Sequence, residues 1–328
     1  MLSSWLQSVP FFSSMTFGII ALVIVGSSWS LTGLVMGDAP KQGIPPSFIQ
    51  LLCGGLSLIG ALAVAACNGT LAIPECSATA FWLTMAAYVF TGFSNFLNLI
   101  WMSRAMQSGP NGIIWAIIQS ALVFPFIGGI IFFGVEATPL RIAGIILLLT
   151  ALGIFSMAKD NSRSGTGGGN WKLLALMCLA LCAVQQNITT IPSYFEECRK
   201  VPSSYRTMGT GFGTMMTALI YILFNTSGDG YAVMKQALTR TRLWMYLLGL
   251  SVFGLFLSIT LLFPGLDVMA AHGLGGMAYP VMVGSCIVSF ILACVFILKE
   301  KLRPVQLVAL TLCITGLVLI CTGPSGGR

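Results

Sequence analysis

Long apolar runs separated by short polar breaks occupy the whole chain. Ten runs reach the length of about 20 mainly apolar residues that a spanning helix needs. Their limits are 15–37, 47–67, 79–103, 112–133, 139–158, 171–193, 204–225, 243–264, 275–298 and 304–322. The runs are continuous and do not alternate apolar with polar positions, which favours helices over barrel strands. The pattern predicts an all-α integral membrane protein with ten transmembrane helices.

Composition supports this prediction. Hydrophobic residues make up 56% of the 328 positions and charged residues only 8%, whereas a soluble domain carries about 25% charged residues. Most of the surface must therefore face a lipid bilayer. The net charge of +7 comes from single Lys and Arg residues between apolar runs, so no basic stripe predicts nucleic-acid binding. The ten cysteines form no CxxC pair or Cys/His metal spacing, and we expect neither a metal nor a cofactor.

The middle of the chain holds a flexible linker, 159–170, rich in Gly and Ser. Shifting the sequence by 164 positions places Gly109 on Gly273, Trp115 on Tyr279 and Glu136 on Glu300. The sequence thus predicts two related five-helix units, 1–158 and 171–328. An odd number of helices makes the second unit enter the bilayer from the opposite side, which gives inverted repeats.

Two segments resemble a known family. Residues 109–157 and, more closely, 273–321 with Leu298-Lys-Glu-Lys-Leu-Arg-Pro-Val-Gln, are similar to the end of an EamA-type repeat. The resemblance implies the drug/metabolite transporter superfamily, whose ten-helix members carry sugars, nucleotide sugars, amino acids and other metabolites. Gly92-Phe-Ser-Asn-Phe with Met102-Ser-Arg is also similar to L-rhamnose–proton symporters and related sugar permeases. The EamA-type match covers about a third of the chain.

Side-chain amides inside the apolar runs are the first candidates for a substrate site, because polar groups within a membrane are expensive to bury. They are Asn95, Asn98, Gln119, Gln185, Gln186 and Asn187. An amide both donates and accepts hydrogen bonds, as binding sugar hydroxyls or zwitterions requires. The alternative is that these amides only join helices. We expect Gln119, Gln185 and Asn95 to converge on the substrate.

Aromatic and basic residues complete the candidate substrate site. Trp29, Trp115 and Tyr279 are candidates to stack on a substrate, although Trp and Tyr also gather at membrane boundaries. Arg104 is a candidate partner for an anionic group, or a side chain that reaches back to the interface.

No Asp or Glu lies centrally in any run, and Asp267 and His272 near a run's end are the candidates for proton coupling. A cationic-drug antiporter, which needs a buried carboxylate, is therefore disfavoured. Gly209-Thr-Gly-Phe-Gly looks superficially like a phosphate loop, but it lies in an apolar run and predicts close helix packing instead.

The sequence predicts a secondary transporter that moves a small polar solute, best a sugar or similar neutral metabolite, by alternating access. Symport with a proton or a sodium ion is the expected coupling. Export of amino acids or other metabolites is the alternative, and a channel or an intramembrane enzyme ranks below it. We expect a multi-pass protein of a bacterial inner membrane. Most of the sixteen Lys and Arg lie in odd-numbered loops, which places both termini outside by the positive-inside rule, whereas the family resemblance favours termini inside.

Overall fold

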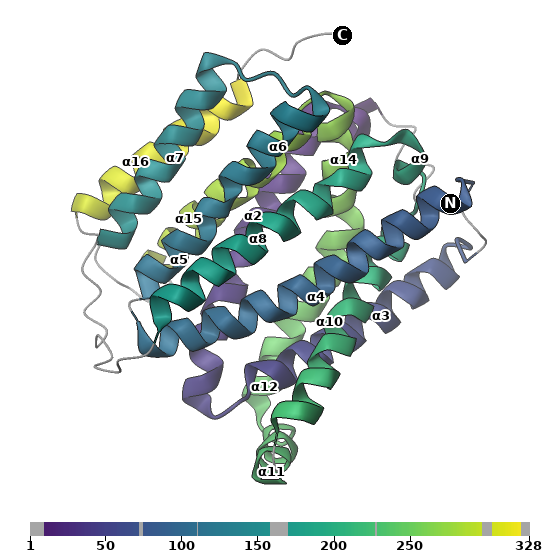
Figure 1. Cartoon of the computed structure of the whole chain (residues 1–328), viewed down its shortest axis with the longest axis vertical. Helices are drawn as coiled ribbons and strands as arrows, with labels where there is room; N and C mark the ends of the chain where they lie inside the picture. Colours follow the sequence, from purple (N-terminus) through teal and green to yellow (C-terminus); the bar gives the residue numbers. More distant parts are fainter. Residues whose placement is uncertain are drawn as a thin grey trace.

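The computed structural model describes residues 10–71, 75–109, 111–157, 170–226, 228–296 and 304–322. Every regular element in these ranges is a helix (Figure 1). Eight described helical stretches are long and apolar enough to cross a membrane, and Pro139–Ile154 and Gly275–Ser289 form shorter apolar helices. The prediction of an all-helical, multi-pass membrane protein is thus confirmed. The predicted linker falls outside the described residues, except for Asn170.

The uninterrupted long helices coincide with the predicted runs to within a few residues, apart from α4, which extends to Ser108. They are α2 (Met15–Asp38), α3 (Pro46–Cys67), α4 (Ala78–Ser108), α7 (Pro139–Met157), α8 (Trp171–Tyr194), α10 (Ser203–Asn225), α15 (Ala278–Phe296) and α16 (Pro304–Thr322). Proline begins α3, α7 and α16, since its missing N–H is unneeded in a first turn. Ser14 and Ser77 cap α2 and α4 by accepting hydrogen bonds from backbone N–H groups.

Two of the predicted runs are interrupted helices. Run 112–133 consists of α5 (Asn111–Gln119), the 3-10 turn η3 (Ser120–Leu122) and α6 (Val123–Phe133). Run 243–264 consists of α12 (Thr241–Leu247), α13 (Phe253–Leu257) and α14 (Phe263–Ala271), joined by the π-helical turns η4 (Leu248–Val252) and η5 (Ser258–Leu262). This compound helix, α12–α14, extends seven residues beyond the predicted limit, so Asp267 lies within it. The remaining described elements are short: η1 (Pro10–Ser13), η2 (Ala39–Gln42), α9 (Glu196–Arg199), α11 (Gly228–Ala237) and η6 (Gly275–Met277).

Glycines set the spacing of the main helix pairs, which are α2 with α15, α3 with α10, α4 with α10 and α7 with α16. A Cβ added at Gly26 of α2 would lie 2.1 Å from the carbonyl oxygen of Met282 on α15. One added at Gly213 of α10 would lie 2.1 Å from the carbonyl oxygen of Val89 on α4, and Gly211 faces α3. The prediction that the glycines of 209–213 serve close helix packing is confirmed.

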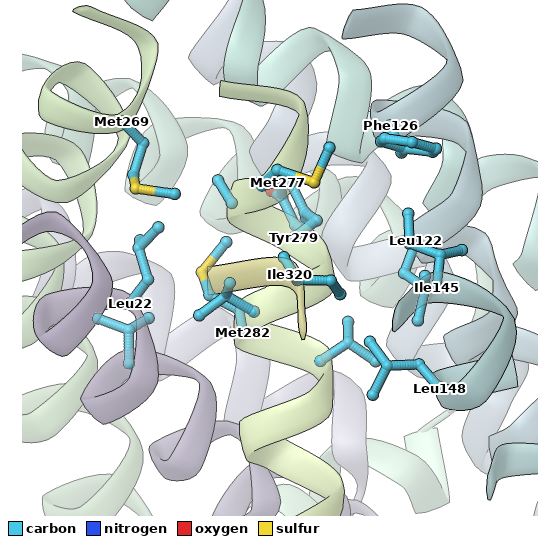
Figure 2. Close-up of a cluster of buried hydrophobic side chains, with 14 of the residues drawn as sticks. Leu22, Leu122, Phe126, Ile145, Leu148, Met269, Met277, Tyr279, Met282 and Ile320 are labelled. Atoms are coloured by element: carbon cyan, nitrogen blue, oxygen red, sulfur yellow. The ribbon is translucent and has the colours of Figure 1, made fainter. Parts of the chain in front are cut away.

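The largest buried apolar cluster lies among α2, α6, α7, α14 and α15 (Figure 2). Figure 2 shows Leu22 on one side of this cluster, Tyr279 in its middle and Leu122 and Leu148 on the other side. Large apolar side chains also cover the outside of the bundle, where Phe132 and Phe224 are 77% and 85% exposed. An outer surface of this kind suits contact with lipid.

Candidate functional site

A row of buried polar side chains, here called the α4–α8 seam, lies where α4 packs against α8. Its members are Tyr88, Thr91, Ser94 and Asn98 on α4 and Cys182, Gln186, Thr189 and Ser193 on α8. The Tyr88 hydroxyl donates to the Thr189 carbonyl oxygen over 3.2 Å, and the Thr91 and Thr189 hydroxyls lie 3.1 Å apart. These bonds join the two helices through groups that apolar packing would not require.

Several seam atoms have no partner among the described residues. The side-chain oxygens of Asn98 and Gln186 are buried without a hydrogen bond, as are the Ser94 and Ser193 hydroxyls. The Gln186 amide nitrogen donates to the Cys182 sulfur over 3.1 Å. Leaving a buried acceptor unpaired costs about 1–3 kcal/mol. Such atoms in a folded protein indicate a place for ordered water or a polar ligand.

The other predicted amides have separate surroundings. The Asn187 amide nitrogen donates to the Ala183 carbonyl oxygen of its own helix over 2.8 Å, and its oxygen lies against Gly128 of α6. The Gln185 oxygen is buried without a partner in the described structure. Gln119 is buried at the end of α5, and Asn95 is half-buried on α4. No hydrogen bond between described groups joins Gln119, Gln185 and Asn95, so their convergence stays a prediction.

The predicted aromatic residues meet on α2. The Trp29 ring of α2 lies 5.9 Å from the Tyr279 ring of α15, at an interplanar angle of 39°. Trp115 of α5 covers Gly33 of α2, where an added Cβ would lie 3.1 Å from the indole. Trp115 and Tyr279, the two positions that the predicted repeat would place in register, therefore both contact the first long helix.

Arg104 lies apart from the seam. Its side chain is exposed, donates to the Tyr221 hydroxyl of α10 and lies 5.6 Å from the centre of that ring. Because α4 extends to Ser108, Arg104 stands one turn inside the helix and not at its end. In this structure it joins α4 to α10.

Arg206 is the main functional candidate that the sequence pattern did not single out. The pattern counted it as loop charge, but it lies in the first turn of α10 with no exposed surface. Its guanidinium donates to Asp267 Oδ1 of α14 over 2.8 Å and to the carbonyl oxygens of Cys198, Arg199 and Val201 over 3.1 Å each. The predicted run 204–225 already contained Arg206, but a cation in the first turn of a run is typical of the membrane boundary, so its burial left no signal in the sequence.

Asp267 and His272, predicted together, do not pair in the structure. Asp267 faces Arg206, whereas exposed His272 caps the end of α14 and holds Nδ1 2.9 Å from the Val268 carbonyl oxygen. The ring centres of Tyr88 and Phe263 lie 6.0 and 5.9 Å from the guanidinium carbon of Arg206. The ion pair therefore stands directly beside the seam.

The opposite end of the compound helix carries another polar cluster. Tyr246 of α12 donates to Asp38 at the end of α2, and Arg242 lies 3.8 Å from the same carboxylate. Arg240 donates to the carbonyl oxygen of Gln42 in η2. Helix α12–α14 is thus held to α2 at one end and to α10 at the other.

A cavity of about 340 Å³ lies between α2 and the interrupted part of the compound helix. Its lining residues are Val25, Ser27, Ser28, Trp29, Ser30, Leu31 and Thr32 from α2, and Gly249, Leu250, Gly254, Leu257, Ser258 and Leu262 from α12–α14. Both π-helical turns contribute to its wall. π-Helical turns occur frequently at functional sites.

Comparisons with known proteins establish the fold alone. No protein-family model matches the chain, and no curated protein matches it. A solved crystal structure superposes with a TM-score of 0.66 at 17% identity. The superposition covers 94% of this chain and 96% of the other. The likeness therefore extends over the whole helical bundle.

Proposed function

We propose that this protein is a secondary transporter that moves a small polar solute, best a sugar or a similar neutral metabolite, by alternating access. The observation that carries the proposal is the α4–α8 seam, where Asn98 and Gln186 have unpaired amide oxygens inside a bundle of apolar helices. Polar groups at such places mark substrate or ion pathways in membrane proteins. The amides Asn95, Gln119, Gln185 and Asn187 surround the seam on α4, α5 and α8 in this proposal.

Two inverted five-helix repeats and membership of the drug/metabolite transporter superfamily are part of the proposal. The pairing of helices supports the repeat. In the proposed repeat α2 corresponds to α8, α4 to α12–α14, and α5 with α6 to α15. The contact of α2 with α15 then corresponds to that of α8 with α5 and α6, and the contact of α4 with α8 corresponds to that of α14 with α2. In the pairs α3 with α10 and α7 with α16, each helix packs against its own counterpart in the other repeat. In many secondary transporters, inverted repeats place the substrate near the midplane, between the repeats.

The polar clusters at the two ends of α12–α14 supply the gates in this proposal. The Arg206–Asp267 pair closes one end and the Asp38–Tyr246 contact closes the other. Opening one gate while the other stays closed would expose the seam to one side at a time. The coupling ion is proposed to be a proton or sodium, with Asp267 as the coupling group, since it contacts a buried cation and His272 is exposed.

Flux into proteoliposomes tests the function. A carrier takes up labelled hexose with saturation and shows counterflow when the vesicles are preloaded with unlabelled hexose. Flux of labelled amino acids without flux of hexoses would favour the alternative, an exporter of amino acids or other metabolites. Linear uptake without counterflow would indicate a channel, and the absence of flux for all solutes would contradict transport. Uptake with and without a pH or sodium gradient identifies the coupling ion.

A further inference from the structure

The cavity between α2 and α12–α14 has a wall whose chemistry is specific enough to name a ligand class. Its polar side chains are hydroxyls and one indole, and none of the described residues that line it is charged. Ser27, Thr32 and Ser258 have hydroxyls without a hydrogen-bond partner among the described residues, and so does the indole N–H of Trp29. The wall therefore presents unused donors and acceptors to whatever occupies the cavity.

The two other serines of this wall behave differently. The Ser28 hydroxyl donates to the Val25 carbonyl oxygen over 2.6 Å, and the Ser30 hydroxyl donates to the Ser27 carbonyl oxygen over 2.8 Å. Their protons are used within α2, but their oxygen lone pairs stay available as acceptors. A ligand that meets hydroxyls of both kinds must both donate and accept hydrogen bonds. Alcohol groups do this.

The absence of charge from the wall selects against ionic ligands. An isolated carboxylate or ammonium group moved out of water needs a countercharge, because the loss of hydration is otherwise uncompensated. The closest carboxylate along α2 is Asp38, six residues after Thr32, or about 9 Å along the axis. Asp38 already contacts Tyr246 and Arg242. A neutral ligand is favoured.

The size and the aromatic side of the cavity narrow the class further. Ligand pockets commonly measure about 300–1,000 Å³, so a cavity of about 340 Å³ suits a molecule of one sugar ring. Trp29 contributes a flat ring that the apolar face of a pyranose can cover, and Leu250, Leu257 and Leu262 form an apolar wall. We propose that this cavity binds a neutral polyhydroxylated solute of monosaccharide size, with Trp29 against its apolar face and the α2 hydroxyls on its alcohol groups.

The inference rests on the proposed transport function, and it places the solute against α2 and α12–α14 instead of among the amides of the α4–α8 seam. The seam then provides the hydrated path beside the binding site. The π-helical turns make room for the ligand at Gly254, where an added Cβ would meet no atom within 4 Å. A larger side chain at Gly254 can therefore fill the cavity without a clash.

Gly254→Leu is the test variant, and Gly153→Leu on α7 is its matched control. Gly153 also has no atom within 4 Å of an added Cβ, and it lies outside the cavity lining. Purified full-length protein is heated in detergent with D-glucose and other neutral hexoses, D-glucuronate and D-glucosamine, since a ligand that binds the folded state raises the melting temperature. We expect neutral hexoses to stabilise the parent and Gly153→Leu but not Gly254→Leu. We expect the charged analogues to bind about tenfold more weakly or worse.

Thr32→Val keeps the test decisive if Gly254→Leu does not fold, with Thr311→Val on α16 as its control. Thr311 lies outside the cavity and bonds within its own helix, to the Leu307 carbonyl oxygen. Loss of hexose binding in Thr32→Val, with binding retained in Thr311→Val, supports the site. Equal binding of glucuronate or glucosamine, undiminished binding in the cavity variants, or no binding of any neutral hexose overturns it. Stabilisation by long-chain fatty alcohols and by no hexose would assign the cavity to acyl chains and also overturn it.

Flux separates this inference from the proposed function. Hexose uptake that Gly254→Leu and Thr32→Val leave unchanged overturns the binding site and leaves the transporter intact. Hexose binding that these variants abolish, in a protein that shows no flux for any solute, overturns transport and leaves the site.

Discussion

Arg206 on α10 donates to Asp267 on α14 over 2.8 Å, and none of the Arg206 side chain is exposed. Backbone carbonyl oxygens of Cys198, Arg199 and Val201 accept its remaining hydrogen bonds. A planar guanidinium with five donors suits this arrangement, and a lysine ammonium does not. The pair fixes the position of α14 relative to α10 beside the α4–α8 seam.

Breaking this ion pair should destabilise the protein strongly. Asp267→Asn leaves the Arg206 charge buried without its countercharge, and losses of this kind amount to about 3–5 kcal/mol. Thermal unfolding in detergent measures the change. Lys200→Ala, which removes the exposed pair with Glu197, is the control and should lower the melting temperature only slightly. A melting temperature for Asp267→Asn equal to that of the parent would contradict a structural role for the pair.

The amides of the proposed pathway should matter more for flux than for stability. Gln119→Ala and Gln185→Ala should each reduce uptake roughly tenfold or more, a change of about 1.4 kcal/mol in the barrier, with near-normal surface expression. Gln186→Met removes an unpaired buried oxygen, so it should lower flux while leaving the melting temperature equal or higher. Parent-like uptake with reduced thermal stability would show that these amides only join helices.

The glycine contacts predict which helix pairs tolerate no side chain. A Cβ at Gly92 of α4 would lie 2.1 Å from the Thr210 carbonyl oxygen of α10. Gly92→Leu should therefore force the helices apart and cost about 1–3 kcal/mol or more. The yield of monodisperse protein on size exclusion measures this. Gly153→Leu is again the control, and equal yields from the two variants would refute the close contact.

Native Cys67 offers a test of orientation. It is exposed at the end of α3, on the side where Tyr205 donates to the Leu71 carbonyl oxygen. Lys235, Arg240 and Arg242 lie toward the opposite side, which the positive-inside rule makes cytoplasmic. A variant with Cys67 as its sole cysteine should react with an impermeant maleimide in intact cells. Gln236→Cys in a cysteine-free background should not react, and the reverse pattern would place the termini inside.

The thermal stability of the protein should depend slightly on the ionisation of Glu197, which lies outside the membrane-spanning helices. The ammonium group of Lys200, followed by the backbone N–H of Ser77, lowers the pKa of Glu197. A lowered pKa means that the contribution to stability is present above the unfolded value of about 4.3 and disappears as pH falls through the folded value. The parent should melt slightly above Glu197→Gln at pH 7, and the difference should disappear as the pH falls through the lowered folded pKa of Glu197. A difference that persists in acid would contradict this linkage.

Helix existence could be predicted from the sequence because apolar runs report directly on contact with lipid. The interruptions could not be predicted. Nothing in the apolar stretch Leu247–Leu262 indicates two π-helical turns, since these turns depend on how α12–α14 packs against its neighbours. Close packing at 209–213 was predictable, because glycine spaced by two in an apolar run has few other uses.

The candidate site was predictable only in part: the sequence singled out its buried amides but not its buried cation. Amides stand out against apolar neighbours, so Asn98 and Gln186 were found as candidates. Arg206 resembled any interfacial cation, because its burial is produced by carbonyl groups of 198–201 and by Asp267, 61 residues further along the chain. Pairing across such a distance leaves no local pattern. The cavity beside Trp29 depends on two helices in the same way.

The two π-helical turns make chain length itself a determinant of this fold. A π-helical turn closes hydrogen bonds over five residues instead of four, so each one accommodates an extra residue in α12–α14. Deleting one residue from η5 would restore an ordinary helix there and keep Asp267 on the face that meets Arg206. Deleting one residue from the regular turn of α14 before Asp267 would instead rotate Asp267 away from Arg206 by about 100°. The same loss of one residue, with no change in hydropathy, therefore has opposite consequences a few positions apart.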